Sequence, residues 1–307
     1  MTGTSVRKAL KYLLIGLLSL FVTACVQLVR NSGVNTLSAP SPAYLRIATL
    51  NVHYIVLRRQ TGAWSLGDWE RRKVALDLAF KAIAPDVIGF QEMESFAGGD
   101  NGDINLGLDW LLSQNPSYEA AAVGDWRRFP STQPILYRDD RLNLIDQGWF
   151  FFSDTPDVIY SRTFNGSYPA FASWAAFSTD DGKRFKVINV HFEYKSRSNR
   201  LQSAALVAAR IQPWIDAGEN VVVLGDLNAR NGARTQSILA EVGITFNPVK
   251  GSTYHFNRGL NLFGAIDHIG ATADFHAETP PVVLRQEFNG EWPTDHYPVV
   301  VDYTISR

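Results

Sequence analysis

Six groups of polar residues stand beside hydrophobic, strand-like runs in this 307-residue chain. They are Asn51, Gln91-Glu92, Asn189 with His191, Asp226 with Asn228, Asp267-His268 and, just before the last run, Asp295-His296. A turn or a strand end explains any one of them. All six carry carboxylate, amide or imidazole groups, so we expect the ends of several buried strands to build one site.

The hydrophobic runs that must position these groups predict an α/β fold. Eight runs are short and rich in Val, Ile and Phe, as buried strands are. They are Leu45–Val52, Val87–Phe90, Gln133–Tyr137, Ala172–Ser178, Phe185–His191, Val221–Leu224, Ala265–Ile269 and Val299–Ile305. Apolar periodicity predicts helices over Trp69–Ala84, Arg200–Trp214 and Thr235–Val242. No helical pattern interrupts residues 133–191, so we expect part of the sheet to be antiparallel.

The order of the polar groups resembles that of the endonuclease/exonuclease/phosphatase superfamily, which includes DNase I-like nucleases, neutral sphingomyelinases and inositol polyphosphate 5-phosphatases. The matching motifs are Asn51, QE at 91–92, NVH at 189–191, GDLN at 225–228, ID at 266–267 and TDH at 294–296. The resemblance runs from about Leu45 to Tyr303. It implies one domain over residues 45–307, folded as a four-layer α/β sandwich of two mixed β-sheets flanked by helices.

The resemblance also implies hydrolysis of a phosphoester with a divalent cation. Mg²⁺, with Mn²⁺ as a substitute, is the expected cofactor, because it prefers carboxylate, amide and water oxygens. We expect Glu92 to be its main ligand, with Asn51 and Asp295 nearby. A zinc site is disfavoured, because the only cysteine is Cys25 and the chain has no H-E-x-x-H motif.

The other motif residues are expected to activate water and to hold phosphate. Asp226 would accept or orient the proton of the attacking water, with Asn228 beside it if the backbone stays extended. His296, paired with Asp267, would contact a phosphate oxygen or help to activate the water. His191 is the second expected phosphate contact. Whether Asp226 or His296 acts as the base stays open in the sequence.

Residues 1–24 predict an export signal. Arg7, Lys8 and Lys11 precede an apolar run, and Val22-Thr23-Ala24-Cys25 follows it. The segment resembles a bacterial lipoprotein signal, which makes Cys25 the candidate for lipidation. The alternative is an uncleaved membrane anchor over Tyr12–Val29. Either one would tether the protein to a membrane outside the cytoplasm.

Residues 25–44 are rich in Ser, Asn, Pro and Gly and predict a linker between lipid and domain. In the lipoprotein pattern, Val26 after the cysteine favours the outer membrane of a cell that has one. We therefore expect the protein in the bacterial cell envelope, facing the periplasm or the exterior. We also expect it to be a monomer.

The net charge of the chain argues against an overall positive electrostatic field that would attract nucleic acid. The formal charge is −1, and without residues 1–24 it is −4, with 26 basic and 30 acidic residues. Local basic groups remain at Trp126-Arg127-Arg128 and within residues 195–200. These groups favour a nuclease, because Arg and Lys contact phosphates and Trp126 offers a face for a base.

A phospholipid substrate is the main alternative to nucleic acid. The membrane tether and the aromatic run at residues 149–152 favour a sphingomyelinase-like phospholipid phosphodiesterase, although such a run is also typical of a buried strand. Another phosphatase activity is the third choice. Inositol phosphates are disfavoured, since that branch has Cys-Asp-Arg where this chain has Ile266-Asp267-His268. The last alternative is not an enzyme but a tethered binding protein without catalytic activity. The presence of all six polar motif groups argues against it.

Overall fold

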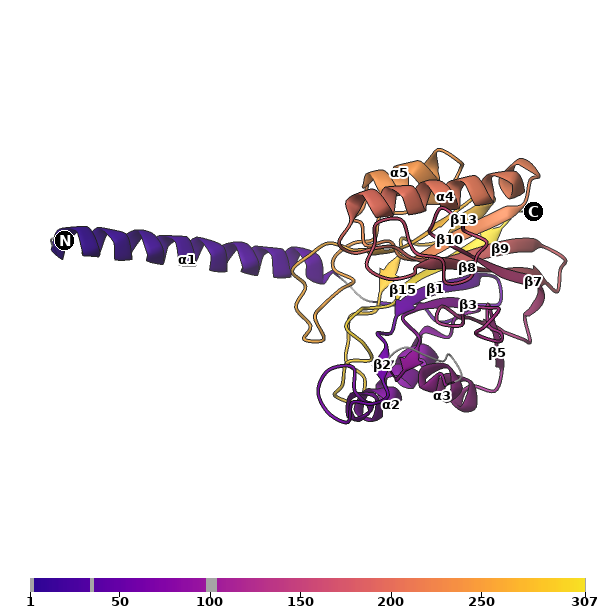
Figure 1. Cartoon of the computed structure of the whole chain (residues 1–307), viewed down its shortest axis with the longest axis horizontal. Coiled ribbons are helices and arrows are strands. Elements are labelled where there is room, and N and C mark those ends of the chain that lie inside the picture. The colour runs from indigo at the N-terminus through magenta and orange to yellow at the C-terminus, as the bar shows by residue number, and fades with distance from the viewer. Residues whose placement is uncertain (1–2, 34–35, 98–103, 307) are drawn as a thin grey trace.

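The computed structural model describes residues 3–33, 36–97 and 104–306. Two β-sheets pack face to face, and helices cover the outer face of each (Figure 1). α2 (Leu66–Ile83) and α3 (Leu106–Gln114) lie over the first sheet. α4 (Arg197–Asp216) and α5 (Arg234–Ala240) lie over the second. The predicted four-layer α/β sandwich is therefore confirmed.

The first sheet has seven strands in the order β13-β15-β1-β3-β6-β5, with β14 also paired to β15. Its strands are β1 (Leu45–Asn51), β3 (Val87–Gln91), β5 (Tyr118–Ala121), β6 (Ile135–Arg138), β13 (Phe275–Ala277), β14 (Val282–Val283) and β15 (Val299–Ile305). The β1–β3 pair is parallel and the others are antiparallel, so the sheet is mixed.

The second sheet has six strands in the order β11-β12-β10-β9-β8-β7. Its strands are β7 (Leu142–Phe151), β8 (Phe171–Thr179), β9 (Arg184–His191), β10 (Asn220–Asp226), β11 (Thr245–Phe246) and β12 (Asp267–Ala271). The antiparallel run β7-β8-β9 confirms the expectation for residues 133–191, and β9–β10 is the parallel pair. A small parallel pair, β2 (Ile55–Val56) and β4 (Ser95–Phe96), lies outside both sheets.

Three clusters of buried side chains fill the three interfaces between the four layers. Val222 and Leu224 of β10 belong to the cluster between the sheets, whereas Val221 and Val223 belong to the cluster under α4. The central strands are thus buried on both faces, which explains their continuous hydrophobic sequence. Full burial of one such side chain contributes roughly 1.5–3 kcal/mol relative to exposure.

Several element boundaries differ from the predicted ones for local reasons. α2 begins three residues early, because the Ser65 side chain accepts a hydrogen bond from Asp68 N at 3.1 Å and caps the helix. β12 begins at Asp267 because Ile266 N and Asp267 N donate to the Thr253 hydroxyl. The sequence did not reveal α3, which is nine residues long and too short for a clear apolar period.

The first helix, α1 (Gly3–Ser32), projects from the domain (Figure 1). It is continuous through Cys25, so the start of the predicted linker is helical. Its segment Arg7–Ser32 is long and apolar enough to cross a membrane, a property that signal sequences share. Ser252 N donates to Asn31 O at 2.9 Å, and Arg285 Nη1 donates to Ser32 O at 3.0 Å. These bonds satisfy carbonyls at the end of the helix.

Ala84, the residue that ends α2, has φ 45° and ψ 57°. A Cβ in this left-handed region costs roughly 1–2 kcal/mol. We expect Ala84→Gly to raise the free energy of unfolding by about 1 kcal/mol in urea titrations, since part of the gain is lost to the freer unfolded chain. The control is Ala82→Gly, at an exposed position in the last turn of α2. It should lower the same quantity by roughly 0.5–1 kcal/mol, and equal losses in both variants would contradict the strain assigned to Ala84.

Candidate active site

The ends of central strands from both sheets meet at one edge of the sandwich. In the first sheet, Asn51 at the end of β1 lies beside Gln91 of β3. In the second sheet, Asp226 at the end of β10 lies between His191 of β9 and Asp267 of β12. Asn51 Nδ2 donates to Asp226 Oδ2 at 3.3 Å, which joins the two sheets. The structure therefore brings together polar groups that are far apart in the sequence.

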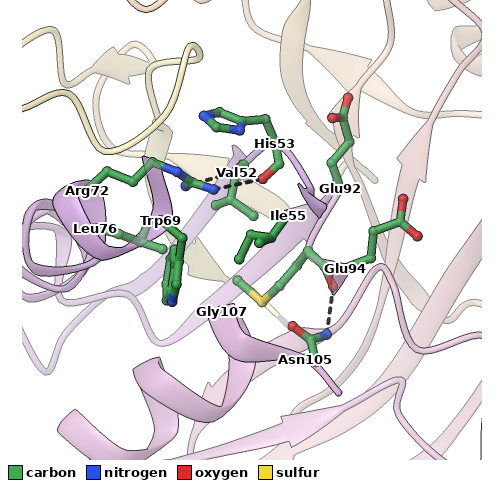
Figure 2. A pocket seen from close by; sticks show the side chains of 11 residues that line it. Val52, His53, Ile55, Trp69, Arg72, Leu76, Glu92, Glu94, Asn105 and Gly107 are labelled. Atoms are coloured by element: carbon green, nitrogen blue, oxygen red, sulfur yellow. Dashed lines mark hydrogen bonds between the residues drawn. The ribbon is translucent and has the colours of Figure 1, made fainter. Parts of the chain in front are cut away.

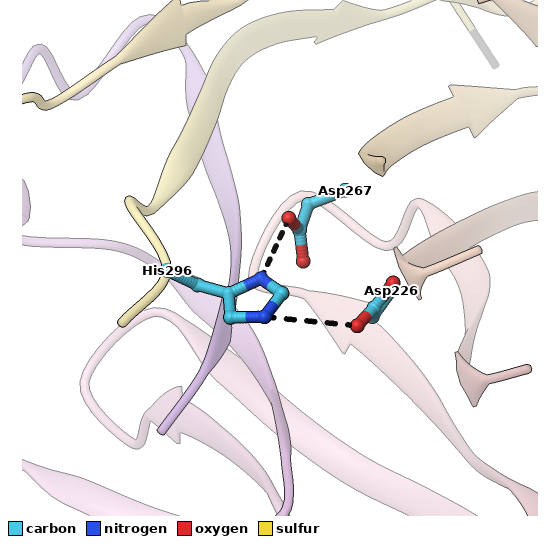
Figure 3. Close-up of side chains that lie close together, drawn as sticks. All are labelled: Asp226, Asp267 and His296. Atoms are coloured by element: carbon cyan, nitrogen blue, oxygen red, sulfur yellow. Dashed lines mark hydrogen bonds and ion pairs between the residues drawn. The ribbon is translucent and has the colours of Figure 1, made fainter. Parts of the chain in front are cut away.

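His296 lies between two buried carboxylates (Figure 3). Its Nδ1 is 2.9 Å from Asp267 Oδ2, and its Nε2 is 3.9 Å from Asp226 Oδ2. Burial disfavours the imidazolium, but the charge and hydrogen bond of Asp267, and then the charges of Asp226 and Asp295, outweigh it and raise the pKa of His296. These charges favour the protonated form of His296, in which Nδ1–H donates to Asp267.

Asp226 and His191 respond to burial in opposite directions. Burial and the charge of Asp267 raise the pKa of Asp226, while His296 and His191 oppose the rise. Burial lowers the pKa of His191, whose Nε2 lies 3.6 Å from Asp226 Oδ2 and 3.7 Å from Glu92 Oε1. The result is a carboxylate that accepts a proton more readily than an exposed one, beside a neutral imidazole.

Loop contacts hold His296 and Asp267 at this edge. Thr294 Oγ1 donates to Asn51 O at 2.9 Å and so attaches the TDH segment to the end of β1. Tyr297 N donates to Thr253 O at 2.6 Å. The Thr253 hydroxyl accepts from Asp267 N at 3.2 Å. One threonine thus fixes the backbone of both segments that carry the His296–Asp267 pair.

The GDLN turn after β10 sets the direction of Asp226. Gly225 has φ 136°, and a Cβ there would lie 1.9 Å from Val190 O, so only glycine fits. Asn228 has φ 46°, and its N donates to Asp226 Oδ1 at 2.8 Å. Its Nδ2 donates to Phe192 O at 2.9 Å. The backbone is therefore not extended after Asp226, and the Asn228 side chain holds the turn by its bond to the main chain.

Glu92 and Asp295 form the carboxylate pair of the site. Burial raises the pKa of Glu92, the Asn51 hydrogen bond opposes the rise, and the charge of Asp295 adds to it. A bound cation would relieve this repulsion, and carboxylate oxygens suit Mg²⁺ or Mn²⁺. The donor chemistry of Glu92 and Asp295 therefore fits the expected metal.

Asn51 is a hydrogen-bond donor to both Glu92 and Asp226 in this structure. Its Nδ2 lies 3.1 Å from Glu92 Oε1, and its Oδ1 accepts from His53 N at 3.2 Å. The amide therefore orients Glu92 and Asp226, and its role as a metal ligand stays a prediction.

Asp226, Asp267 and His296 each place one ligand atom within 4.8 Å of the other two. Such a set could also hold a metal ion. We interpret it instead as a hydrogen-bonded imidazole–carboxylate pair with a second carboxylate nearby, because Asp267 Oδ2 already accepts from the imidazole. In that interpretation the metal lies toward Glu92 and Asp295.

A cavity of about 810 Å³ opens over these groups. Its lining includes His191, Asp226, Asn228, His296 and the carboxylate pair Glu92 and Asp295. Asp267 is fully buried and does not line the cavity, so it reaches the site only through His296. The arrangement separates groups that can touch a substrate from those that position them.

Gln91 and Asn189 form a buried amide bridge that we did not predict. Gln91 Nε2 donates to Asn189 Oδ1 at 2.7 Å, and Asn189 Nδ2 donates to Phe90 O at 2.8 Å. Both side chains are inaccessible to solvent. They join β3 to β9 across the sheets behind the site. Part of the signal was present in the sequence, since Asn189 interrupts a hydrophobic run, whereas Gln91 only follows one.

A second, much smaller cavity of about 10 Å³ lies between the end of β1 and α2 (Figure 2). Arg72 Nη1 donates to Val52 O and Nη2 to His53 O, both at 3.0 Å. Figure 2 shows the carboxylates of Glu92 and Glu94 directed away from Arg72. Arg72 thus anchors the loop after β1, while the two glutamates face the large cavity.

His255 is buried, and it stacks on Tyr297 with ring centroids 4.0 Å apart. Its Nδ1 accepts from Gly259 N at 3.2 Å. Burial, followed by the charge of His296, lowers the pKa of His255 from 6.5 to about 3. Between these two values the unfolded chain binds a proton that the folded chain does not. Stability therefore falls as the pH falls through this window.

When the pH is lowered from 7.5 to 5, the neutral, buried His255 should reduce the free energy of unfolding by about 2 kcal/mol. Urea titrations of the parent and His255→Phe at these two pH values measure the effect. The variant should lose that much of the pH dependence, whatever its absolute stability at pH 7.5. An unchanged pH dependence in the variant would contradict a neutral, buried His255.

Comparison with solved structures shows the same fold in other proteins. An endonuclease/exonuclease/phosphatase family protein from Bacteroides thetaiotaomicron is 22% identical, with a TM-score of 0.72 over 87% of this chain and 100% of that one. The mannosyl-6-phosphatase of the same species is 22% identical, with a TM-score of 0.71 over 85% and 100%. D. rerio TDP2 complexed with a single-strand DNA product is 16% identical, with a TM-score of 0.58 over 85% and 99%.

The comparison with curated proteins gives no match. The family model described as "Endonuclease/Exonuclease/phosphatase family" matches residues 48–296. That range contains Asn51, Glu92, the GDLN turn and the Asp267–His296 pair of the site described above. This match extends over most of the chain, so the protein belongs to the Endonuclease/Exonuclease/phosphatase family.

Proposed function

We propose that the protein is a phosphoester hydrolase that uses a divalent cation, Mg²⁺ or Mn²⁺. This proposal rests on one observation: two sets of charged side chains meet at the same cavity. The carboxylates of Glu92 and Asp295 supply hard oxygen ligands. In the second set, His296 is a proton donor that Asp267 holds in place, and Asp226 beside it is a proton acceptor.

The cation, when bound by Glu92 and Asp295, would neutralise charge on the phosphate oxygens. Asp226 would take a proton from the attacking water as the water oxygen bonds to phosphorus and the bond to the leaving oxygen breaks. His296, with Nδ1–H held by Asp267, would direct Nε2–H toward a phosphate oxygen. The protonation of His296 between two carboxylates favours Asp226 over His296 as the base. Neutral His191 would donate a second hydrogen bond to the phosphate.

Nucleic acid is the substrate that we propose first, by cleavage of a phosphodiester. Two exposed basic residues, Arg127 and Lys195, lie close to residues that line the cavity. The Tyr160 hydroxyl, at the lining, donates to Trp126 O, and Arg127 lies 4.4 Å from the ring centre of Trp126. Lys195 Nζ lies 5.1 Å from the ring centre of Tyr194, another lining residue. D. rerio TDP2, which has the same fold, forms a complex with a single-strand DNA product.

A phospholipid phosphodiesterase is the second proposal. The aromatic run at residues 149–152 does not support it, because Phe150, Phe151 and Phe152 are buried in the core. Support comes instead from exposed Phe256, Leu260 and Phe263, in the loop that follows the contact of Ser252 with α1. With α1 as signal or anchor, and Cys25 as the proposed lipidation site, this loop would face a membrane surface. A cell-envelope location, at the outer membrane where there is one, belongs to the same proposal.

Metal binding is tested by thermal unfolding of the full-length protein. We expect Mg²⁺ to raise the melting temperature, because a ligand at a hundred times its Kd adds about 2.7 kcal/mol of stability. Glu92→Gln should abolish the rise. Glu70→Gln, on the exposed face of α2, should keep it. A full response in Glu92→Gln would place the metal elsewhere, and no response in the parent would favour a binding protein without activity.

Catalysis is tested by nicking of supercoiled plasmid with Mg²⁺ or with EDTA. We expect Asp226→Asn and His296→Gln each to lower the rate roughly 10²- to 10⁴-fold, as loss of an acid–base group does, with the melting temperature preserved. Asp180→Asn, at an exposed position of the β8–β9 turn, is the matched control and should act like the parent.

Near-parental rates in Asp226→Asn or His296→Gln would refute the site assignment. If the folded parent protein does not nick plasmid, the same variants would be assayed on sphingomyelin vesicles, where metal-dependent turnover would support the lipid proposal.

A further inference from the structure

Aromatic side chains make up much of the wall of the large cavity. The lining includes Tyr54, Trp64, Phe96, Phe151, Tyr160, Tyr168, Phe171, Tyr194 and Tyr254. Three of them, which we call the aromatic rim, are exposed to solvent: Trp64 to 37%, Tyr160 to 44% and Tyr194 to 55%. Core packing does not explain aromatic rings that stay exposed. Their grouping at one cavity is typical of a binding surface.

Two residues of the aromatic rim have strained backbones. Trp64 has φ 59° and Tyr160 has φ 56°, in the left-handed region that bulky residues avoid. Glycine or asparagine would fit these positions at lower cost. Val56 N donates to Trp64 O at 2.7 Å, which helps to hold the strained residue. Such strain concentrates at sites that bind ligands, so these rings are placed for something other than stability.

The rings form flat faces close to the reacting groups. Tyr54 stacks on Trp64, with ring centroids 5.8 Å apart and an interplanar angle of 17°. Tyr160 meets Phe151 edge to face, with centroids 5.6 Å apart. Tyr54, Trp64 and Tyr160 line the same cavity as Glu92 and His296. A phosphoester held at Glu92 and His296 would therefore extend its organic part toward aromatic faces.

The charges of the cavity wall limit what that organic part can be. Among the described residues that line the cavity, none is Lys or Arg. Glu94 adds a carboxylate to those of the reacting site. Away from the His296 imidazolium and the proposed cation, a second phosphate inside the cavity would find no Lys or Arg and would lie in the same cavity as Glu94. Hydroxyl or amino groups, in contrast, can donate to carboxylate oxygens.

We propose that Tyr54, Trp64 and Tyr160 line a subsite that binds one ring of the substrate, a sugar or a single nucleobase, while any further phosphate stays outside the cavity. The inference deepens the proposed function and rests on it for the position of the phosphate. A sugar ring and a nucleobase share this chemistry. Each has a face that packs on an aromatic side chain and polar edges that donate hydrogen bonds. The subsite determines specificity and takes no part in bond cleavage.

Calorimetric titration of the full-length Asp226→Asn protein with Mg²⁺ measures binding without turnover. The probes are glucose 6-phosphate, adenosine 5′-monophosphate, glycerol 3-phosphate and glucose 1,6-bisphosphate. At least one of the two ring monophosphates should bind about tenfold more tightly than glycerol 3-phosphate, as expected from stacking on one aromatic side chain. The tighter one identifies the kind of ring. Glucose 1,6-bisphosphate should bind more weakly than glucose 6-phosphate.

In the Asp226→Asn protein, a second substitution, Trp64→Gly or Tyr160→Gly, should remove most of the preference for ring monophosphates over glycerol 3-phosphate. Trp64→Gly should not lower the melting temperature, because glycine relieves the left-handed strain, and Trp64→Tyr should keep the preference. Asn289→Gly, which changes another left-handed residue (φ 55°) outside the cavity, is the matched control and should change nothing in binding.

Equal binding of ring phosphates and glycerol 3-phosphate would overturn the proposal, as would a preference that survives both glycine variants. An intact ring preference together with a parent protein that shows no metal-dependent turnover would support the subsite and refute hydrolysis. The two failures are therefore distinguishable.

Discussion

The pairing of His296 with buried carboxylates on both sides is the interaction on which the site depends. An imidazolium inside a protein is costly unless opposite charge lies close to it, and two carboxylates without it would repel each other. Asp267 has no access to solvent and acts only by holding Nδ1. Asp226 faces the cavity and supplies the second negative charge beside His296, on the Nε2 side of the ring. Strand pairing fixes Asp226 beside Asp267, and the Thr253 hydroxyl fixes the backbone of Asp267.

The two sheets must keep a constant separation for this cluster to form. Apolar side chains fill most of the interface between them, but apolar packing alone does not specify a register. The Gln91–Asn189 bridge does, because each amide is buried and must find its partner. Asn51 completes the link at the edge by donating to Glu92, which directly follows β3, and to Asp226 at the end of β10. The polar groups between the sheets thus align the strands whose ends carry the reacting residues.

Four of the residues that line the large cavity have a left-handed backbone, as do several residues elsewhere in the described chain. Glu92, Asn228, Trp64 and Tyr160 all have positive φ and all line it. The folded domain maintains these four conformations against their intrinsic cost, which is of order 1–3 kcal/mol each for the non-glycine residues. Such strain is often found at functional sites, and here bulky Trp64 and Tyr160 carry it beside the reacting residues. It joins the carboxylate pair, the turn after β10 and the aromatic wall into one structural unit.

The sequence by itself determined the fold class, the central strands, three of the helices and the family, because continuous apolar runs and ordered motifs are local patterns; the long strand β7 was not predicted. It also indicated which residues carry polar groups at strand ends. Only the tertiary structure decided that Asp267 is sealed behind His296, that the Asn228 side chain holds the turn through the main chain, and that Gln91 and Asn189 bridge the sheets. Tyr54, Trp64 and Tyr160 match no motif, and Tyr160 is far from the other two in the chain. Their common cavity arises from long-range packing, which no local pattern records.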